Sequence, residues 1–508
     1  MTTLSRFLLL VPVLWICWSC ERPTNPVEEG TLTFSQDTLA FDSIFTTLLT
    51  PSERLIVHNE TGRAVNISRV WLESGEKTRF SMIINGRQGN DISDVVIANG
   101  DSVYVFVNFL STLRDEFVEE YINFQVGEEQ QRVLIRARVL DAYFLRARLA
   151  QEGNFLSLTP ESFFFRQDTT LTPDKPIIID GPVFIPEGVT VTILPGTELF
   201  FTPYQFGVRD SNQGLVFGLY SFLIVDGTLQ AVGTADQPIE FKGSRFDSLY
   251  LENPAQWRGL NFRKNSRNNV LQFCEVKNAL IGIQVDSSSV NENPKLTLRQ
   301  TEVKNMGVHG IVGLGFAPGQ TDNEPPAILM ENCIVNSCKQ RTVLILGGGK
   351  YEFVNSTFAN FNVARFSRRI PQVLATNWYS FDGSTGIVYP AYVDFVNCII
   401  WGSEEDEIVK DTLIGAPFTR LRLERCMVRL SPDNEPFIRP LLVESLVNQD
   451  PLFNDYFFRD YRLKEGSPAI NAGLDLSARF QDDYRGRPDS LRYDGFDIGA
   501  LEYYPLEK

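Results

Sequence analysis

Six short segments in the second half of the sequence align on one pattern. Each has an apolar residue, a small residue three positions later, and a second apolar residue two positions further on. Successive small residues, which we call the small-residue column, are separated by 27, 32, 23, 42 and 28 positions. The column comprises Cys274, Thr301, Cys333, Ser356, Cys398 and Cys426, and the segments open at Leu271, Leu298, Met330, Phe353, Phe395 and Leu423.

A period of a few tens of residues with strand-like alternation and no helical periodicity is typical of a β-solenoid. Each segment then belongs to one coil, and stacked coils bury a continuous core that no coil could bury alone. We therefore predict that the small-residue column points inward on successive coils. Asn332, Asn355 and Asn397 precede the column in three of the segments, and four segments end in a polar turn residue.

The region before these segments resembles the opening coils of right-handed parallel β-helix proteins of bacterial surfaces, which have a pectate-lyase-like fold. The resemblance lies in IPEGVTVTILPGTELFF from Ile185, LIVDGTLQAVGTADQPIEFKG from Leu223 and QWRGLNF from Gln256. It implies a right-handed parallel β-helix over residues 181–430. Glycines such as Gly196, Gly227 and Gly233 are expected to supply positive φ at coil corners.

Residues 431–508 are expected to form C-terminal coils and a cap, because an exposed last coil presents an unpaired edge. DPLF from Asp450 and DYRGRPDSLRYDGFDIGALE from Asp483 resemble the closing segment of secreted β-helix proteins, including some polysaccharide lyases. Asp494, Asp497 and Glu502 fit that capping segment.

Residues 31–145 contain seven alternating runs separated by Gly, Asn and Asp turns, as in an immunoglobulin-like β-sandwich. The stretch VHNETGRAVNISRV within residues 55–70 resembles Hydin-type Ig-like modules of bacterial surface proteins. Residues 146–180 are expected to link the two domains. The predicted fold class is therefore all-β, an Ig-like sandwich followed by a right-handed parallel β-helix with a C-terminal cap.

The N-terminal residues 1–20 have the features of a signal peptide. Arg6 precedes an apolar run over residues 7–18 that is too short to span a bilayer, and Ser19 and Cys20 follow. The segment resembles a bacterial lipoprotein signal, which implies lipidation of Cys20 and anchoring to the outer membrane through several acyl chains. Lipidation at Cys17 and ordinary cleavage with secretion are the alternatives. Residues 21–30, with two prolines and Gly30, would form a tether.

Charge and metal-ligating residues narrow the possible partners. The net charge is −16, so nucleic acid is not an expected partner. The only histidines are His58 and His309, and both are interpreted as structural, although the GVHGI context of His309 resembles the Gly-His-Gly element of polygalacturonases. The cysteines of the column and Cys338 are expected to be free and buried. No metal site is therefore predicted, although Ca²⁺ is a possible ligand of the acidic SEEDE loop at residues 403–407.

The strongest candidate for catalysis is a two-by-two charge patch. Alternation from the column turns Glu275 and Glu302 outward on neighbouring coils, with Lys277 beside Lys304. A lysine beside carboxylates could act as the base of a lyase. The alternative is a solvated ladder of opposite charges. A second set, Glu352, Asp394 and Arg422, is placed at a coil corner and has the same two interpretations.

The candidate ligand-binding residues are Trp378, Tyr379 and Phe381, in the longest gap between segments. Exposed aromatic side chains offer flat apolar area to sugar rings, but the same residues could pack the loop onto the solenoid. The expected function is that of a lipid-anchored surface protein with a non-catalytic binding or scaffold role, for which glycan is the candidate ligand. The alternative is a polysaccharide lyase acting on uronate-containing glycans. The ligand, the periplasmic or extracellular face, and the oligomeric state remain open.

Overall fold

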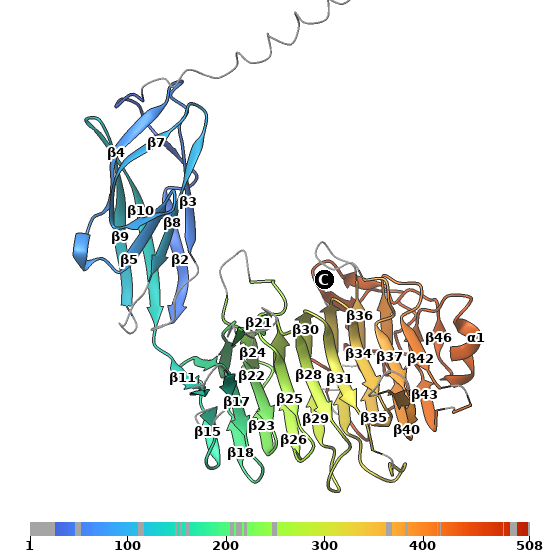
Figure 1. The fold of residues 1–508 in the computed structure, drawn as a ribbon. Helices are drawn as coiled ribbons and strands as arrows, with labels where there is room; N and C mark the ends of the chain where they lie inside the picture. The colour runs from blue at the N-terminus through green and yellow to red at the C-terminus, as the bar shows by residue number, and fades with distance from the viewer. Residues whose placement is uncertain are drawn as a thin grey trace, which may run out of the picture. The chain divides into compact units, whose positions relative to one another are not determined.

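The computed structural model describes residues 26–45, 52–109, 116–147, 150–152, 155–157, 163–203, 208–209, 216–217, 221–245, 251–317, 319–361, 368–380, 385–413, 415–416, 418–480, 482–487 and 495–505. Contacts divide the chain into two compact units, Met1–Asp141 and Ala142–Lys508 (Figure 1). The predicted lipidation site, Cys20, lies outside the described residues, as do Phe381 and Asp494.

The first unit is a sandwich of two five-stranded sheets, in agreement with the predicted Ig-like domain. One sheet has the order β1 (Thr33–Phe34), β3 (Glu53–His58), β8 (Ser102–Phe109), β5 (Phe80–Ile84), β6 (Arg87–Gly89). The other has the order β2 (Thr38–Phe45), β10 (Glu129–Leu140), β9 (Glu116–Val126), β4 (Val65–Leu72), β7 (Asp91–Ile97). A short 3-10 helix, η2 (Gly75–Lys77), follows β4.

Three of the seven predicted runs each contain a turn and form two strands. The clearest case is the run from Phe80, which turns at Asn85 and Gly86, both with positive φ. The inward residues of both sheets form a single core, to which the alternating strand β4 contributes Val65, Ile67, Val70 and Leu72.

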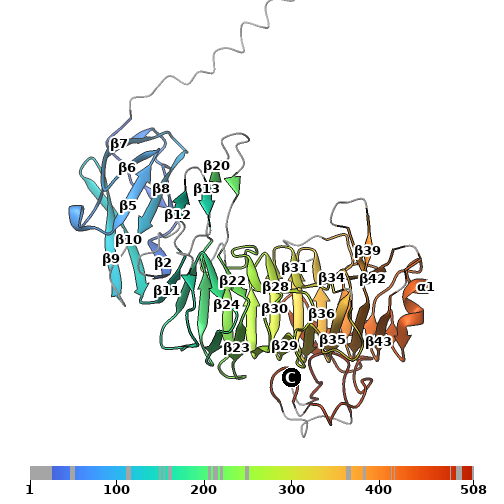
Figure 2. The same cartoon turned by 60° about the horizontal axis from the view of Figure 1, so that its bottom comes forward.

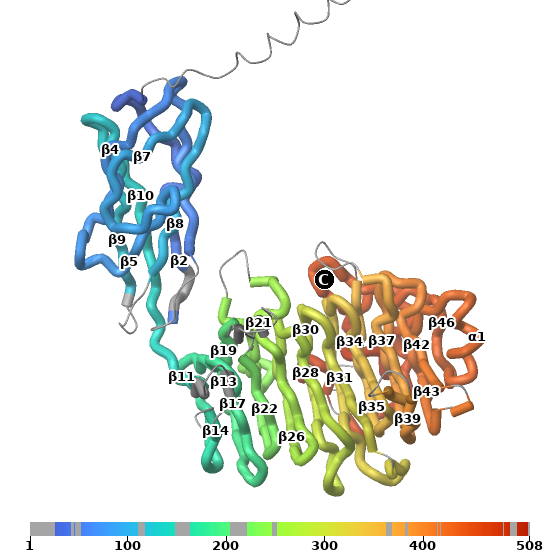
Figure 3. The backbone as a smooth tube through the Cα atoms, in the orientation of Figure 1, coloured from blue at the N-terminus to red at the C-terminus, as the bar shows by residue number. Residues whose placement is uncertain are grey.

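The second unit is a right-handed parallel β-helix, as predicted (Figures 1 and 3). Along the chain each coil passes through three sheets, which we number 1, 2 and 3. Sheet 1 has the order β15 (Thr169–Leu171), β18 (Thr190–Ile193), β23 (Thr228–Val232), β26 (Asn269–Gln272), β29 (Leu296–Arg299), β32 (Ile328–Glu331), β35 (Gly349–Val354), β40 (Ala391–Val396), β43 (Arg420–Glu424), β45 (Leu442–Val443). Sheet 2 has the order β11 (Tyr143–Arg146), β16 (Ile177–Asp180), β19 (Glu198–Phe201), β24 (Ile239–Gly243), β27 (Cys274–Lys277), β30 (Glu302–Met306), β33 (Ile334–Cys338), β36 (Thr357–Asn360), β41 (Ile399–Gly402), β44 (Met427–Val428), β46 (Leu446–Val447).

Sheet 3 completes each coil. Its order is β14 (Phe163–Phe164), β17 (Pro182–Ile185), β22 (Phe222–Val225), β25 (Gly259–Phe262), β28 (Ile281–Asp286), β31 (His309–Leu314), β34 (Arg341–Leu346), β37 (Val373–Thr376), β42 (Ile408–Asp411). Four hairpins complete the strands: β12 (Ala150–Glu152) with β13 (Phe155–Ser157), β20 (Val208–Arg209) with β21 (Val216–Phe217), β38 (Trp378–Tyr379) with β39 (Ile387–Val388), and β47 (Phe453–Asp455) with β48 (Asp460–Leu463).

The solenoid begins earlier than the sequence indicated. Strands β11, β14 and β15 pair in parallel with β16, β17 and β18, so they form the first coil. Strands β14, β15 and β16 within the expected linker over residues 146–180 are therefore part of the β-helix. These first strands are only two to four residues long, too short for a readable alternation.

The small-residue column is buried, as predicted, with every member at most 3% exposed. Each aligned segment spans a corner between sheet 1 and sheet 2 rather than forming one strand. The residue before the column makes the corner by adopting positive φ, between 44° and 51° in all six segments. These corner residues are Phe273, Gln300, Asn332, Asn355, Asn397 and Arg425.

A hydrogen bond from the column side chain closes each corner. Thr301 Oγ1 is 2.8 Å from the carbonyl oxygen of Arg299, and Ser356 Oγ donates to the carbonyl of Val354 at 2.8 Å. The thiols of Cys274, Cys333, Cys398 and Cys426 make the same contact with the carbonyl two residues earlier, at 3.1 to 3.4 Å. Ser, Thr and Cys recur because each is small and also donates a hydrogen bond.

Two of the three predicted corner glycines have another role. Gly196 has positive φ, as expected, but Gly227 and Gly233 do not. A Cβ on Gly227 would lie 2.3 Å from the carbonyl oxygens of Pro186 and Val189, and one on Gly233 would lie 2.7 Å from that of Phe273. These positions require glycine because neighbouring backbone approaches closely.

Only part of the C-terminal region covers the end of the stack. Helices α1 (Glu435–Ile438) and η3 (Arg439–Leu441) precede the last short strands, and Ile438 is fully buried in the solenoid core. The described residues from 448 onward return along the outer face of sheet 2, and we call them the return segment (Figure 2). Its apolar side chains pack on outward residues of β33, β36, β41 and β44, namely Ile334, Ala359, Ile399, Trp401 and Met427.

Asp497 and Glu502 therefore do not cap the end of the solenoid. Asp497 accepts hydrogen bonds from the backbone of Asn471 and Tyr503, and Glu502 accepts one from the backbone of Asp497. Both carboxylates hold the return segment in its own folded shape. The segment joins the solenoid through bonds such as that from Ala500 N to Thr357 Oγ1, 3.0 Å.

Candidate functional site

The predicted charge patch lies on the outer face of sheet 2. Glu275 is paired with Glu302 and Lys277 with Lys304 on neighbouring strands, as predicted. The Lys304 ammonium lies 2.8 Å from Glu275 and 2.7 Å from Glu302, and Lys277 lies 2.5 Å from Glu275. The patch extends through Glu240 to Lys242 on the preceding strand, so that cations and carboxylates alternate across several coils.

These charges hold one another in the ionised state. Burial raises the pKa of Glu275, but Lys304 and Lys277 outweigh that effect and lower the pKa to about 2. Burial alone would lower the pKa of Lys304, whereas Glu302 and Glu275 raise that pKa above its usual value. A lysine held in its charged form is a poor proton acceptor. The geometry therefore favours a ladder of opposite charges over a catalytic base.

The second charged set lies within sheet 1 and not at a coil corner. Glu352, Asp394 and Arg422 occupy paired positions on β35, β40 and β43, and they face outward. The expectation was wrong because the positive-φ residue between this strand and the column shifts the alternation by one position. Arg420 lies 2.5 Å from Asp394, and Arg422 lies 2.5 Å from Glu424, so this set also consists of neutralised pairs.

The aromatic residues of the longest gap lie on the β38–β39 hairpin. Trp378 and Tyr379 are half-buried, and Tyr379 contacts the ring of Phe316 with a centroid separation of 5.1 Å. A Cβ on Gly386 would lie 3.2 Å from both the Trp378 ring and Leu413. These two side chains thus take part in packing the hairpin onto the solenoid.

The carboxylates of the acidic SEEDE loop are mostly engaged with neighbouring protein groups. Asp406 accepts hydrogen bonds from Ser431 and Asn434. Glu407 is buried, and both of its carboxylate oxygens accept from Arg368 Nη2, at 2.6 and 2.7 Å. Glu405 is exposed and makes no hydrogen bond or ion pair with any residue that the structure describes. Within the same described ranges, no group of three or more His, Cys, Asp or Glu side chains is placed to hold a metal ion.

His309 begins β31, and its ring is only partly exposed. Burial, together with the charge of Arg341, lowers the pKa of His309 to about 4, so this imidazole is neutral at physiological pH. The five described cysteines are free and buried. Burial raises the pKa of Cys333 to about 12, which leaves its thiol unreactive.

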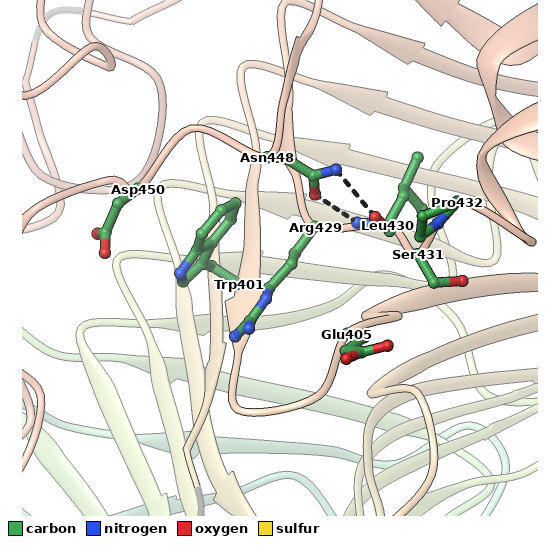
Figure 4. A pocket seen from close by; sticks show the side chains of 8 residues that line it. All are labelled: Trp401, Glu405, Arg429, Leu430, Ser431, Pro432, Asn448 and Asp450. Atoms are coloured by element: carbon green, nitrogen blue, oxygen red, sulfur yellow. Dashed lines mark hydrogen bonds between the residues drawn. The ribbon is translucent and has the colours of Figure 1, made fainter.

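A pocket of about 450 Å³ lies where the return segment leaves the last coils (Figure 4). Trp401 of β41, a largely buried side chain, and Arg429, which follows β44, line it, and the Arg429 guanidinium lies 5.8 Å from the Trp401 ring centroid. The backbone around them is fixed, because Arg429 donates to the carbonyl of Gly402 at 2.6 Å and Asn448 bonds both backbone groups of Leu430. The remaining lining residues are Glu405, Ser431, Pro432 and Asp450.

This pocket retains unused hydrogen-bonding capacity. Among the described residues, none accepts a hydrogen bond from Trp401 Nε1, and the only acceptor for the Arg429 guanidinium is Gly402. Glu405 supplies a carboxylate with no described partner. Donors and acceptors beside an aromatic ring are the groups that a polyhydroxylated ligand requires.

The sequence interpretation did not identify this pocket, although the aligned segments contain its signal. Trp401 and Arg429 stand three residues after the column, the position that Lys277 and Lys304 occupy on earlier coils. Pairing along sheet 2 follows this position from Lys304 through Asn336 and Ala359 to Trp401. A tryptophan at an outward position on a coil indicates a surface that is covered by another part of the chain or that contacts a ligand.

Comparison with protein-family models gives no match, and comparison with curated proteins gives none either. Among solved structures, the chain has 10% identity to an ASH/PapD-like domain of human CEP192, covering 24% of this chain and 93% of that one with a TM-score of 0.17. It also has 10% identity to a family 123 glycoside hydrolase from Clostridium perfringens, covering 28% of this chain and 31% of that one with a TM-score of 0.18. TM-scores this low support no inference about function.

Among the residues that the structure describes, we find no helix whose length and apolar character would let it cross a bilayer.

Proposed function

We propose that this protein is a lipid-anchored surface protein whose β-helix binds glycan without chemical turnover. The observation that carries the proposal is the Trp401–Arg429 pocket, where an indole N–H, a guanidinium and the Glu405 carboxylate have unused hydrogen-bonding capacity. Sugar hydroxyls both donate and accept hydrogen bonds, and sugar C–H faces stack on aromatic rings.

The charged faces of sheets 1 and 2 support a binding role over the alternative of a uronate lyase. A lyase requires a base that loses its proton near neutral pH. Lys277 and Lys304 are each paired with carboxylates, and the pKa of Lys304 is raised. Arg420 and Arg422 are likewise paired with acidic side chains.

The anchoring and location parts of the proposal come from the N-terminal sequence. Lipidation of Cys20 would place the protein on the outer membrane through acyl chains, with residues 21–30 as the tether. The sandwich would then precede the glycan-binding solenoid along the chain.

A glycan array probed with the full chain and three pocket variants tests the binding site. Trp401→Phe removes the indole N–H and keeps an aromatic ring, Glu405→Gln removes one charge, and Arg429→Ala removes the guanidinium. We expect the affinity of each variant for the bound glycan to fall by about threefold to tenfold, which is the effect of losing one or two hydrogen bonds. Arg422→Ala, on sheet 1, serves as the matched arginine control.

Retention of full affinity in all three pocket variants would place the binding site elsewhere. The lyase alternative is tested on the same glycans by measuring the formation of unsaturated uronate product. A product signal that vanishes in Lys277→Ala or Lys304→Ala would replace the proposal with that alternative.

A further inference from the structure

The return segment exposes an aromatic tip. Tyr456, Phe457 and Phe458 connect β47 to β48 and are 40%, 65% and 86% exposed. Tyr456 stacks on Phe361 at 4.3 Å with an interplanar angle of 17°, and Phe457 stacks on Tyr456 at 4.8 Å and 27°. We call these four residues the aromatic shelf. Phe457 ends the stack, so its outer face is open to solvent.

The shelf is held rigidly. Asp455 Oδ1 accepts hydrogen bonds from the backbone of Phe457 at 3.0 Å and of Phe458 at 3.3 Å. Arg459, directly after the tip, bonds Ser337 Oγ at 3.1 Å and forms an ion pair with Glu252 at 2.8 Å. A ligand that binds to this tip therefore does not have to order it, which lowers the entropic cost of binding.

The shelf and the pocket adjoin through one hydrophobic cluster. Phe361 directly follows β36, which pairs with β41 so that Ala359 and Asn360 lie beside Trp401 and Gly402. Trp401 and Phe453 both belong to the cluster, and Phe361 packs against it. Phe361 of the shelf therefore lies one strand along sheet 2 from Trp401 of the pocket, the direction in which a linear ligand could extend.

We propose that the aromatic shelf is an extension subsite for a neutral oligosaccharide bound in the Trp401–Arg429 pocket. This inference rests on the proposed function and names its ligand class. Stacking against a sugar ring requires a flat aromatic face, which Phe457 and Phe458 present.

The charges around both sites favour a neutral ligand over an anionic one. The pocket sets one guanidinium against the carboxylates of Glu405 and Asp450. At the shelf, Arg459 and Arg462 are paired with Glu252 and Asp460. Two carboxylates beside one guanidinium give the pocket a net negative charge, and both arginines at the shelf are ion-paired, so a uronate or an anionic lipid headgroup is disfavoured. The tip is too small for a stable protein interface.

The test is isothermal titration calorimetry of the full chain with neutral oligosaccharides of increasing length, from disaccharide to hexasaccharide, in gluco-, xylo- and manno-configured series. A parallel titration with oligogalacturonates of the same lengths measures the affinity for anionic ligands. The variants are Phe457→Ala with Phe458→Ala together, and Phe437→Ala as a control. Phe437 is an equally exposed phenylalanine, 63% exposed, on α1. All three positions are on the surface, so folding is expected to be retained.

We expect wild-type affinity to rise with oligosaccharide length, and the double variant to lose about threefold to tenfold for the hexasaccharide with little change for the disaccharide. The Phe437→Ala variant should behave as the wild type. Wild-type binding with an unchanged length dependence in the double variant would overturn the shelf inference alone, as would a preference for oligogalacturonates. Absence of any wild-type glycan binding would overturn the proposed function itself.

Discussion

At the scale of single residues, the repeat is a set of corners, each closed by one side chain. The column residue is small enough for the interior and donates to the carbonyl two positions earlier. Its backbone N–H in turn bonds the column side chain of the next coil, as in Cys333 N to Ser356 Oγ at 3.2 Å. The alignment missed a seventh member of the column, Ser445. It belongs to the column because the preceding residue, Glu444, has positive φ and the Ser445 hydroxyl donates to the carbonyl two positions earlier.

Removing one of these hydroxyls should destabilise the solenoid measurably. Thr301→Val keeps the side-chain volume but leaves the Cys274 N–H without its partner and removes one of the two hydrogen bonds that the Arg299 carbonyl accepts. We expect a loss of about 1–3 kcal/mol in unfolding free energy, the cost of buried groups left unsatisfied. Chemical denaturation of the full chain measures it. Thr301→Ser restores the hydroxyl and should recover most of the stability, and equal stability of the Val and Ser variants would refute the role of the bond.

The charge ladder makes a prediction about acid stability. The pKa of Glu275 is lowered from 4.5 to about 2, so its ionised form is favoured in the folded protein. Its contribution is complete above about pH 4.5 and is lost as the pH falls toward 2. Lys304→Met removes the largest cause of the lowered pKa, so the variant should lose less stability than the wild type over that range. Parallel pH dependences of the two proteins would show that Lys304 does not set this pKa.

At the scale of elements, the sequence predicted the stack and the inward column but not the corners within the segments. One residue with positive φ reverses the alternation, and apolar spacing alone does not reveal it. The outward position directly after the column changes from charged to apolar along the chain, and this change indicates that the later coils are covered. It is Glu275 and Glu302 on the earlier coils, and Ile334, Ile399 and Met427 on the later ones. The covering element itself could not be inferred, because docking of the return segment depends on contacts between residues far apart in sequence.

Close backbone approach between coils can be tested at two glycines. Gly227→Ala places a Cβ 2.3 Å from two carbonyl oxygens, whereas Gly188 has positive φ, 83°, and open space around it. We expect a loss of about 3 kcal/mol or more for the first and about 1 kcal/mol for the second. Thermal unfolding of both variants measures the difference. Equal losses would mean that the overlap at Gly227 costs no more than the positive φ at Gly188.

At the scale of the whole molecule, the proposed lipid anchor precedes a sandwich and a solenoid whose outward charges are paired with one another. Cys20→Ser should move the protein from the membrane fraction to the soluble fraction, because the acyl chains have no attachment point. Fractionation with mass analysis of the N-terminal peptide measures both changes. A variant that stays in the membrane fraction with its acyl mass intact would exclude Cys20, and Cys17→Ser is the matched control.

The central claim is that the solenoid binds glycan and leaves it chemically unchanged. The most direct measurement incubates the full chain with a bound oligosaccharide from the array and then determines the mass of the recovered sugar. The account predicts recovery of the intact oligosaccharide by the wild type and loss of its capture by Arg429→Ala. Recovery of a shortened or unsaturated product, formed by the wild type and not by Lys304→Ala, would contradict it.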